Sequence, residues 1–193
     1  GEAVGSQDQI WAAHGGLSRI NFSQDGTFDV HPIVIEPERR KLLNSHMMLF
    51  FTGFSRIAAE IEKEKIANVD KRKTQLRALG AMVDEGTQIL QNRNGDISEI
   101  GELLNEAWRL KKEMSDKVTT AAIDEIYEAA LDAGAMGGKL LGAGGGGFLL
   151  LFVAPEKHAS VRKRLGSLTH VSIEIGSSGS RIVVYEPEEQ ETF

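Results

Sequence analysis

The stretch Lys139-Leu-Leu-Gly-Ala-Gly-Gly-Gly-Gly-Phe148, followed directly by the apolar run Leu149 to Val153, decides the fold of this chain. Seven of the 21 glycines fall between Gly137 and Gly147. Glycine loses roughly 0.5–1 kcal/mol more backbone entropy than alanine on folding, so this cluster is costly to order. Such a loop is kept where backbone N–H groups converge on an anion, or where the chain forms a hinge or a tight packing turn. The preceding lysine and the strand-like run after the loop favour anion binding.

Two common nucleotide-binding motifs do not fit this loop. Gly142 to Gly147 matches the spacing G-x-G-x-x-G, but that fingerprint needs a strand before it and a helix after it. Here a helical pattern ends near Gly134, and we expect the strand to come after the glycines. A Walker A loop requires Lys and Ser/Thr where this chain has Phe148 and Leu149. The anion-binding interpretation therefore depends on neither motif.

Composition indicates a soluble globular protein and excludes several kinds of site. Hydrophobic residues make up 41% and charged residues 26% of the chain, which has a formal net charge of −6. This charge argues against binding to nucleic acid or to an anionic membrane. The absence of cysteine excludes disulfides, thiol catalysis and cysteine-based zinc sites. No apolar run is near the length of about 18 residues that spans a membrane, and no signal peptide is evident, so we expect a cytoplasmic protein.

Two further stretches are candidates for chemistry or binding. Asp8, in Gly5-Ser-Gln-Asp-Gln-Ile10, lies in the first turn of an expected short helix. A carboxylate there also complements the helix dipole, worth about 0.3–1 kcal/mol, and helix propensity alone favours that structural role. Thr52-Gly-Phe-Ser-Arg56 follows an expected strand, and its turn into a helix can bind an anion through free N–H groups and the arginine. A plain helix cap explains this second stretch equally well.

Taken together, the three stretches resemble the GHMP kinases, a superfamily that includes galactokinase, homoserine kinase, mevalonate kinase and phosphomevalonate kinase. The glycine loop resembles the third, C-terminal glycine motif of that family. Within the superfamily, the chain most resembles the sugar 1-kinases of the D-glycero-D-manno-heptose 7-phosphate kinase type. The family's first motif and its Pro-x-x-x-Gly-Leu-x-Ser-Ser phosphate loop are not in this sequence. We therefore expect the chain to be the C-terminal part of a larger kinase.

The resemblance implies an α+β fold, with a ferredoxin-like GHMP kinase C-terminal domain preceded by part of the N-terminal domain. We expect residues 1–45 to be the remnant of the N-terminal domain, 46–186 to be the C-terminal domain and 187–193 to be an acidic tail. Apolar runs and alternation predict strands near 47–52, 147–153, 170–175 and 181–186, with helices between them.

The resemblance also implies transfer of the ATP γ-phosphoryl group to the anomeric hydroxyl of a heptose 7-phosphate, in nucleotide-activated heptose biosynthesis for lipopolysaccharide or capsule. Asp8 would be the catalytic aspartate, and Thr52, Ser55, Arg56 and Lys139 would bind substrate. The ATP phosphate loop would consist of Gly142, Ala143, Gly144, Gly145, Gly146 and Gly147. Mg²⁺ is expected, with its ligands in the upstream part and no metal ligand in this chain.

Alternatives remain open at this point. The chain fits another GHMP small-molecule kinase, acting on fucose, galactose or a mevalonate-pathway acid. It also fits a non-catalytic GHMP-like binding domain whose glycine loop serves packing. The partners implied by the resemblance are a small-molecule sugar phosphate and ATP, with no nucleic acid and no membrane, and an oligomer is left open. We expect the isolated chain to be inactive, because it lacks the family's phosphate loop.

Overall fold

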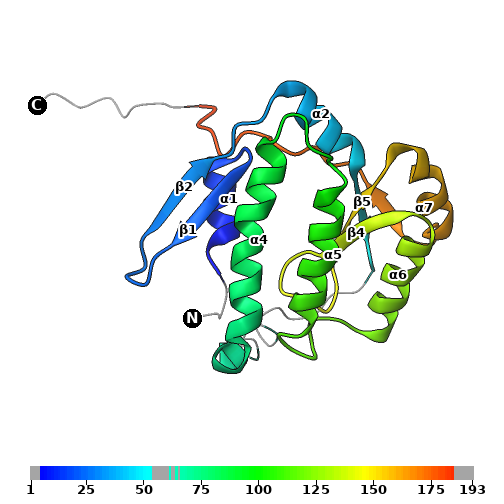
Figure 1. Cartoon of the computed structure of the whole chain (residues 1–193), viewed down its shortest axis with the longest axis horizontal. Helices are drawn as coiled ribbons and strands as arrows, with labels where there is room; N and C mark the ends of the chain where they lie inside the picture. The colour runs from blue at the N-terminus through cyan, green and yellow to red at the C-terminus, as the bar shows by residue number, and fades with distance from the viewer. Residues whose placement is uncertain (1–4, 54–60, 62–63, 65, 185–193) are drawn as a thin grey trace, which may run out of the picture.

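The computed structural model describes residues 5–53, 61, 64 and 66–184 (Figure 1). The N-terminal part begins with helix α1 (Gln7–His14) and a two-stranded antiparallel sheet of β1 (Ser18–Phe22) and β2 (Phe28–Pro32). The turn of this hairpin is held by Asp25, whose Oδ1 accepts hydrogen bonds from the amide of Thr27 at 3.0 Å and from its hydroxyl at 2.7 Å. In the sequence, Gln24-Asp-Gly26 is a turn signal that predicts a hairpin between Leu17 to Phe22 and Thr27 to Val30. This hairpin and the short helix that carries Asp8 are confirmed.

The remaining elements lie within residues 37–171. They are α2 (Pro37–His46), β3 (Met47–Phe51), η1 (Val69–Arg72), α4 (Lys73–Gln91), α5 (Glu99–Lys112), α6 (Ala121–Asp132), β4 (Ala135–Leu140), β5 (Phe148–Val153), η2 (Pro155–Lys157), α7 (His158–Arg164) and β6 (Thr169–Val171). Local signals explain several boundaries. Pro37 starts α2 at a position where proline's fixed φ suits a helix. Thr120 caps α6, and its hydroxyl accepts a hydrogen bond from the amide of Ile123 at 3.3 Å.

The larger sheet has the strand order β4-β5-β3-β6, and all neighbouring strands are antiparallel. Along the chain, β3 is followed by helices, then by the adjacent pair β4 and β5, then by α7 and β6. Strand β5 is thus inserted between β3 and β4, which is the split βαβ arrangement of ferredoxin-like folds. The expected α+β fold with a ferredoxin-like domain is confirmed.

Three predictions for this sheet differ from the structure. Strand β4 precedes the glycine loop, where we expected no strand. Of the strand predicted over 181–186, residues 181–184 belong to no described sheet, and residues 185 and 186 lie outside the described residues. Strand β6 ends at Val171, short of the predicted 170–175. Ile182 and Val183 are 83% and 93% exposed. Their β-branched side chains favour extended backbone, but extended backbone becomes a strand only when another strand pairs with it.

Two apolar clusters pack against the larger sheet. The first contains Leu149, Leu151 and Val153 of β5 with Trp108 of α5 and residues of α6 and α7. The second contains Phe152 with residues of α2, α4 and α5. Since successive side chains of a strand point to opposite faces, the two clusters lie on opposite faces of β5. The helical spacing of Ile97, Ile100, Leu104 and Trp108 in the sequence predicts that Trp108 lies in the core, and its exposure of 1% confirms this prediction. None of the helices in the described ranges is long and apolar enough to cross a membrane.

Candidate functional site

The glycine loop, residues 141–147, connects β4 to β5 as the loop of a hairpin (Figure 1). The amide of Leu141 donates to the carbonyl of Phe148 at 2.8 Å, which closes the hairpin. Gly142, Gly144, Gly145 and Gly147 all have positive φ, from 69° to 122°, a region that side chains with a Cβ rarely adopt. A strand therefore does precede the glycines, contrary to expectation. A strand follows them as well, so the loop still is not a G-x-G-x-x-G fingerprint, which requires a helix there.

Lys111, in the last turn of α5, holds the beginning of the loop. Its ammonium group donates to the carbonyl oxygen of Gly142 at 2.6 Å and to that of Leu140 at 3.1 Å. The same nitrogen lies 5.8 Å from the ring centroid of Trp108, within the range of a cation–π interaction. Lys111, which lies against the buried ring of Trp108, thus fixes the direction in which the carbonyl groups of Leu140 and Gly142 point.

The middle of the loop packs against the segment 115–118. The amide of Gly145 donates to the carbonyl oxygen of Val118 at 2.8 Å. A Cβ added at Gly144 would lie 2.6 Å from that same oxygen and 2.8 Å from the Cα of Val118. Gly144 is therefore required for close packing, and the amide of Gly145 is already occupied. For these two residues the packing interpretation of the glycine cluster is correct.

The segment 115–118 is itself well fixed. The Ser115 hydroxyl accepts from the amide of Lys117 at 3.1 Å, and the Lys117 ammonium pairs with Glu64 at 3.2 Å. A hydrogen bond from the Ser115 side chain, and then one from Lys117, hold the pKa of the Glu64 carboxyl below its usual range. The surface that receives the loop is consequently part of an ordered network.

Thr52 holds the end of the loop to β3. Its amide and its hydroxyl both donate to the carbonyl oxygen of Gly147, each at 2.9 Å, and its side chain is buried. Thr52 was expected to bind substrate; the structure places its hydroxyl on the loop backbone. The next residue, Gly53, belongs to the candidate stretch Thr52-Gly-Phe-Ser-Arg56 but was not singled out within it. It has a φ of 78°, and open space surrounds the position where a Cβ would be.

Several loop amides remain available to a ligand. Those of Gly142, Ala143, Gly144, Gly146 and Gly147 donate no hydrogen bond to any other residue in the described ranges. At Gly142 and Gly147 an added Cβ would meet no atom within 4 Å, so a ligand can approach the backbone closely there. Unpaired N–H groups in a loop of left-handed glycines form an anion-binding concavity. This geometry can bind an anion such as a phosphate group.

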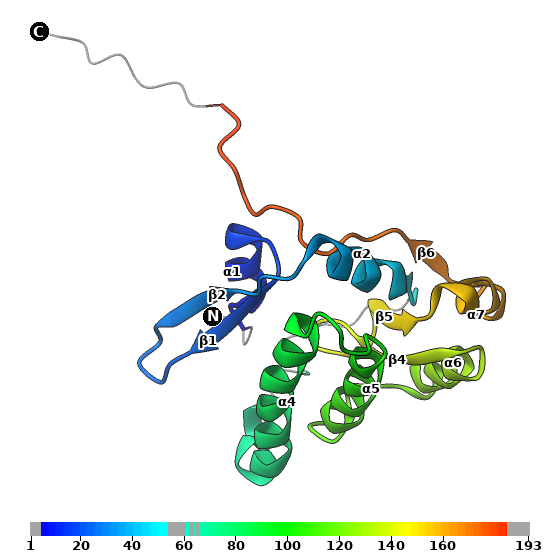
Figure 2. The same ribbon diagram turned by 45° about the horizontal axis from the view of Figure 1, so that its top comes forward.

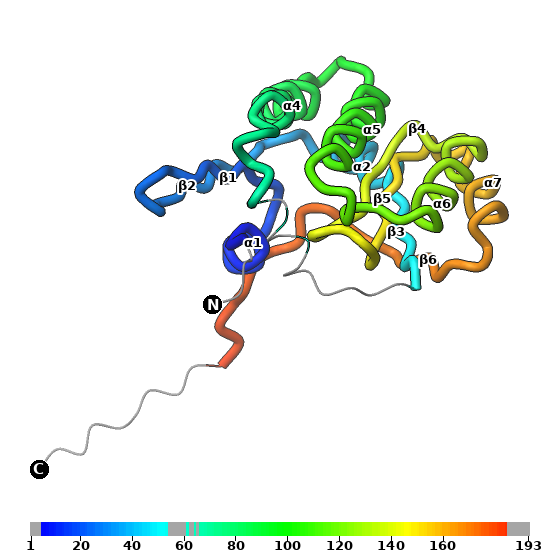
Figure 3. The backbone as a smooth tube through the Cα atoms, turned by 90° about the horizontal axis from the view of Figure 1, so that it is seen from below, coloured from blue at the N-terminus to red at the C-terminus, as the bar shows by residue number. Residues whose placement is uncertain are grey.

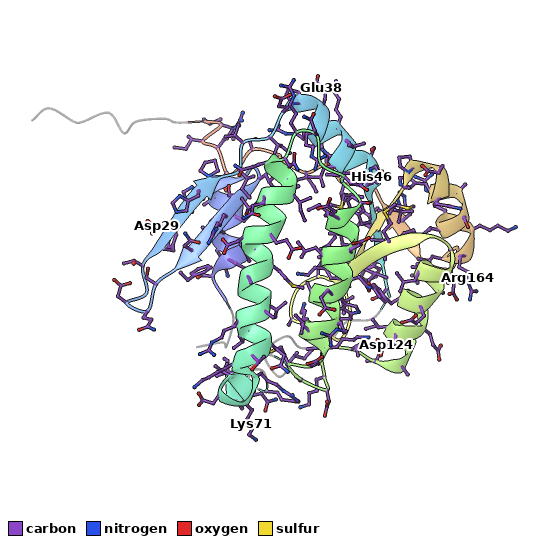
Figure 4. All side chains as sticks on the ribbon, viewed as in Figure 1. Asp29, Glu38, His46, Lys71, Asp124 and Arg164 are labelled. Carbon is purple, nitrogen blue, oxygen red and sulfur yellow. The ribbon has the colours of Figure 1, made fainter. Side chains whose placement is uncertain are left out.

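Behind the loop, Tyr127 of α6 ties α5 to β4. Its hydroxyl donates to Oδ1 of Asn105 at 2.7 Å and also lies 3.3 Å from the carbonyl oxygen of Gly138. Burial removes water from the phenolate and raises the pKa of Tyr127 to about 12. At neutral pH the side chain is therefore a fixed donor. Nearby, Asp124 in the first turn of α6 pairs with Lys112 at 3.2 Å (Figure 4).

Asp8 lies apart from these contacts. It is exposed in the first turn of α1 and forms no hydrogen bond or ion pair with the loop in the part of the chain that the structure describes. Lys139 lies within β4, half-buried and opposite Leu150. Ser55 and Arg56 fall outside the described residues. The structure thus brings Thr52 and the glycine loop together, whereas the proposed roles of Asp8 and Lys139 remain predictions.

Lys111 and Val118 were missed from the sequence. Two lysines at the end of a helix are a common complement to the helix dipole, so their pattern carried no further signal. The described residues also include no group of three or more His, Asp or Glu side chains that could hold a metal ion.

Comparison with known proteins gives this geometry a context. Residues 88–167 match the family model described as GHMP kinases C terminal. The chain is 32% identical over 162 residues to the D-glycero-alpha-D-manno-heptose 7-phosphate kinase of Campylobacter jejuni, a match that covers 83% of this chain and 48% of that protein. It is 29% identical over 173 residues to the bifunctional fucokinase/GDP-fucose pyrophosphorylase of Arabidopsis thaliana, covering 86% of this chain and 16% of that protein.

A solved structure shows the same fold. The mevalonate kinase of L. major, in complex with R-mevalonate, superposes with a TM-score of 0.67 at 20% identity, over 87% of this chain and 52% of that one. The chain spans about half the length of the heptose kinase and of this structure, and less of the bifunctional protein.

Proposed function

Because the chain belongs to the GHMP kinase superfamily, we propose that it forms the C-terminal part of an ATP-dependent kinase that phosphorylates a small molecule. The observation that carries the proposal is the glycine loop, which is fixed at three places and leaves five amides available. Phosphoryl transfer depends on positioning and on neutralising charge more than on covalent chemistry. A rigid row of N–H donors is the kind of support that such a reaction needs.

In this proposal each residue has a defined task. The amides of Gly142, Ala143, Gly144, Gly146 and Gly147 bind phosphate oxygens of ATP, while Gly145 fixes the loop to Val118. Thr52 and Lys111 hold the loop carbonyls away from the phosphates. Asp8 accepts the proton of the attacking hydroxyl or orients that hydroxyl. Arg56 and Lys139 bind the phosphate already present on the substrate, together with Ser55.

Mg²⁺ would neutralise charge on the transferred phosphoryl group, and we propose that residues outside this chain hold it. This assignment follows the family resemblance, which implies that the metal ligands belong to the upstream part of the kinase. The contribution of this chain is then the binding of phosphate by the backbone amides of the glycine loop. We propose that residues 1–45 belong to the N-terminal domain and residues 46–186 to the C-terminal domain. We also propose that the protein acts in the cytoplasm, where it would encounter ATP and a sugar phosphate.

For the substrate we propose a heptose 7-phosphate phosphorylated on its anomeric hydroxyl. The support is the 32% identity to the Campylobacter jejuni enzyme across 83% of the chain. The 29% identity to a fucokinase across a similar length favours L-fucose as the second candidate, because the two identities differ little. Galactose and mevalonate complete the panel to be tested. A non-catalytic binding domain is the remaining alternative.

The test uses the complete protein that carries this chain, in a coupled assay of ADP release with each substrate of the panel. We expect turnover with heptose 7-phosphate to exceed that with the other three. Greater turnover with L-fucose would reassign the substrate, and binding of ATP without turnover on any sugar or acid would favour the non-catalytic alternative. The isolated 193-residue chain, assayed in parallel, should be inactive and bind ATP weakly or not at all.

A further inference from the structure

Residues 175–180, which we call the C-terminal strap, connect two parts of the molecule that are far apart in sequence. Figure 2 shows the chain leaving β6, passing α2 and reaching α1, and Figure 3 shows the same course from below. At its first residue the strap is held by Asn44 of α2. The Asn44 Oδ1 accepts from the amide of Ile175 at 2.7 Å, and its Nδ2 lies 3.4 Å from the carbonyl oxygen of Ile175.

The other end of the strap pairs with the end of α1. The amide of Gly16 donates to the carbonyl oxygen of Ser177 at 2.7 Å, and Gly15 forms a β-bridge with Ser178. The amide and the hydroxyl of Ser180 both donate to the carbonyl oxygen of Ala12, at 2.8 Å and 3.0 Å. Carbonyl groups in the last turn of a helix have no partner within the helix, so the strap supplies the donor that Ala12 lacks.

Two glycines make this approach possible. A Cβ added at Gly179 would lie 2.3 Å from the carbonyl oxygen of Ala13. A Cβ added at Gly15, which has a φ of 67°, would lie 2.0 Å from the amide nitrogen of Gly179. Real Cβ atoms do not come this close to backbone, so both positions require glycine. The strap and the helix are in direct backbone contact.

Among the residues that the structure describes, few contacts other than those of the strap hold helix α1. It has eight residues, and within it only Ile10 is buried. Isolated helices shorter than about 12–15 residues are marginal in water, so a helix this short depends on its tertiary contacts. Its C-terminal residues obtain those contacts from the strap.

We propose that the C-terminal strap positions α1, and that Gly179 thereby acts as a positioning residue for Asp8. The part that concerns Asp8 rests on the kinase function proposed above; the part that concerns the helix does not. The strap connects helix α2 to helix α1, which carries Asp8. Helix α2 leads directly into β3, and Thr52, which follows β3, donates to the glycine loop. Loss of strap contact should move Asp8 while leaving the loop in place.

The variant Gly179→Ala tests this inference in the full protein. The substitution lies far from α1 in sequence, so the intrinsic stability of the helix is unchanged. Gly80→Ala is the matched control, since it adds the same methyl group at a position with ordinary φ and no atom within 4 Å. Hydrogen exchange of amides 10–15 should rise about tenfold or more in Gly179→Ala, with the amides of β4 and β5 unchanged.

Kinetics supply the second readout. In Gly179→Ala we expect kcat to fall about tenfold with the KM for ATP within about twofold of the wild type, because a small displacement of a reacting group lowers the rate without weakening the phosphate loop. If the amides of α1 exchange equally fast in Gly179→Ala and Gly80→Ala, the proposal that the strap holds α1 is wrong. If the amides of α1 exchange faster in Gly179→Ala but kcat is unchanged, the proposal that the strap positions Asp8 is wrong.

Two provisions keep the outcomes separate. If the wild-type protein phosphorylates no substrate, the proposed kinase function fails, while the exchange comparison still decides whether the strap holds α1. If Gly179→Ala does not fold, Ser180→Ala replaces it, because this variant removes only the hydroxyl bond to Ala12 and keeps the backbone bond. It should increase α1 exchange about threefold, as expected for one exposed hydrogen bond; no change would overturn the strap.

Discussion

The glycine loop and helix α1 carry the two halves of the proposed site, and the chain holds them by different means. The loop closes a hairpin between two paired strands and is fixed by Lys111, Val118 and Thr52, of which Val118 and Thr52 are buried. Helix α1 has one buried side chain and is held at its end by a segment more than 160 residues away. The loop should therefore tolerate disturbance of the chain termini, whereas the helix should not.

This difference separates binding from catalysis in the proposed enzyme. Residues that hold the loop should affect the affinity for ATP, and residues that hold α1 should affect the rate of transfer. Of the four substitutions below, Asp8→Asn and Lys111→Met test that division, and Gly144→Ala and Tyr127→Phe test how the loop and the elements behind it are packed.

The largest effect is expected for Asp8→Asn. If Asp8 is the catalytic carboxylate, kcat should fall by roughly 10²–10⁴-fold with little change in the KM for ATP, as for loss of a general base. Asp29→Asn is the control, since Asp29 is an exposed carboxylate on β2 (Figure 4). A wild-type kcat in Asp8→Asn would return Asp8 to the role of a helix-dipole partner and leave α1 without a catalytic task.

Gly144→Ala should show that part of the loop serves packing. The new Cβ would meet the Val118 backbone, and alanine at a φ of 122° is strained, so we expect a loss of roughly 2 kcal/mol in the free energy of unfolding. Gly142→Ala, at a φ of 69° with open space around it, should lose about 1 kcal/mol from backbone strain alone. Denaturant unfolding compares the two. Equal losses would mean that contact with Val118 contributes nothing.

Lys111→Met should weaken ATP binding, with the KM for ATP rising about tenfold, because the carbonyls of Leu140 and Gly142 lose their donor at a net cost of about 1–2 kcal/mol. The neighbouring variant Lys112→Met is a close control. Lys112 lies 5.9 Å from the same Trp108 ring but pairs with Asp124 instead of the loop. Its KM should stay within about twofold. Equal effects of the two variants would argue against a specific role of Lys111 in holding the loop.

The smallest effect concerns Tyr127, whose pKa of about 12 exceeds its ordinary value of 10.0. The unfolded chain therefore loses this proton first, so the stabilisation is complete below pH 10 and decreases as the pH rises toward 12. Tyr127→Phe should cost about 1 kcal/mol at pH 7, from the bond to Asn105, and the deficit should shrink across that range. Unfolding measured at pH 7 and at several values up to pH 11.5 would reveal a constant deficit if the phenol is not the titrating group.

The sequence alone was sufficient to predict the α+β class, the hairpin of β1 and β2, strands β3 and β5, and the family. These features depend on local periodicity, on turn residues such as Asp25 and Gly26, and on a glycine motif that is contiguous in the chain. The family resemblance also led to Asp8, whose role is still a prediction.

Tertiary structure alone decided the remainder. Strand β4 was missed because Met136, Gly137 and Gly138 have weak strand propensity. The two glycines are required because α5 and β5 pack so closely against β4 that a Cβ would not fit. A Cβ at Gly137 would lie 2.0 Å from the carbonyl oxygen of Gly101, and one at Gly138 would lie 2.3 Å from that of Leu150. In the same way, Gly179 reads as a turn residue in the sequence, yet its neighbour is the end of α1. Local propensity describes one segment at a time, whereas a close approach between backbones depends on both, so the folded chain alone shows which glycines it requires.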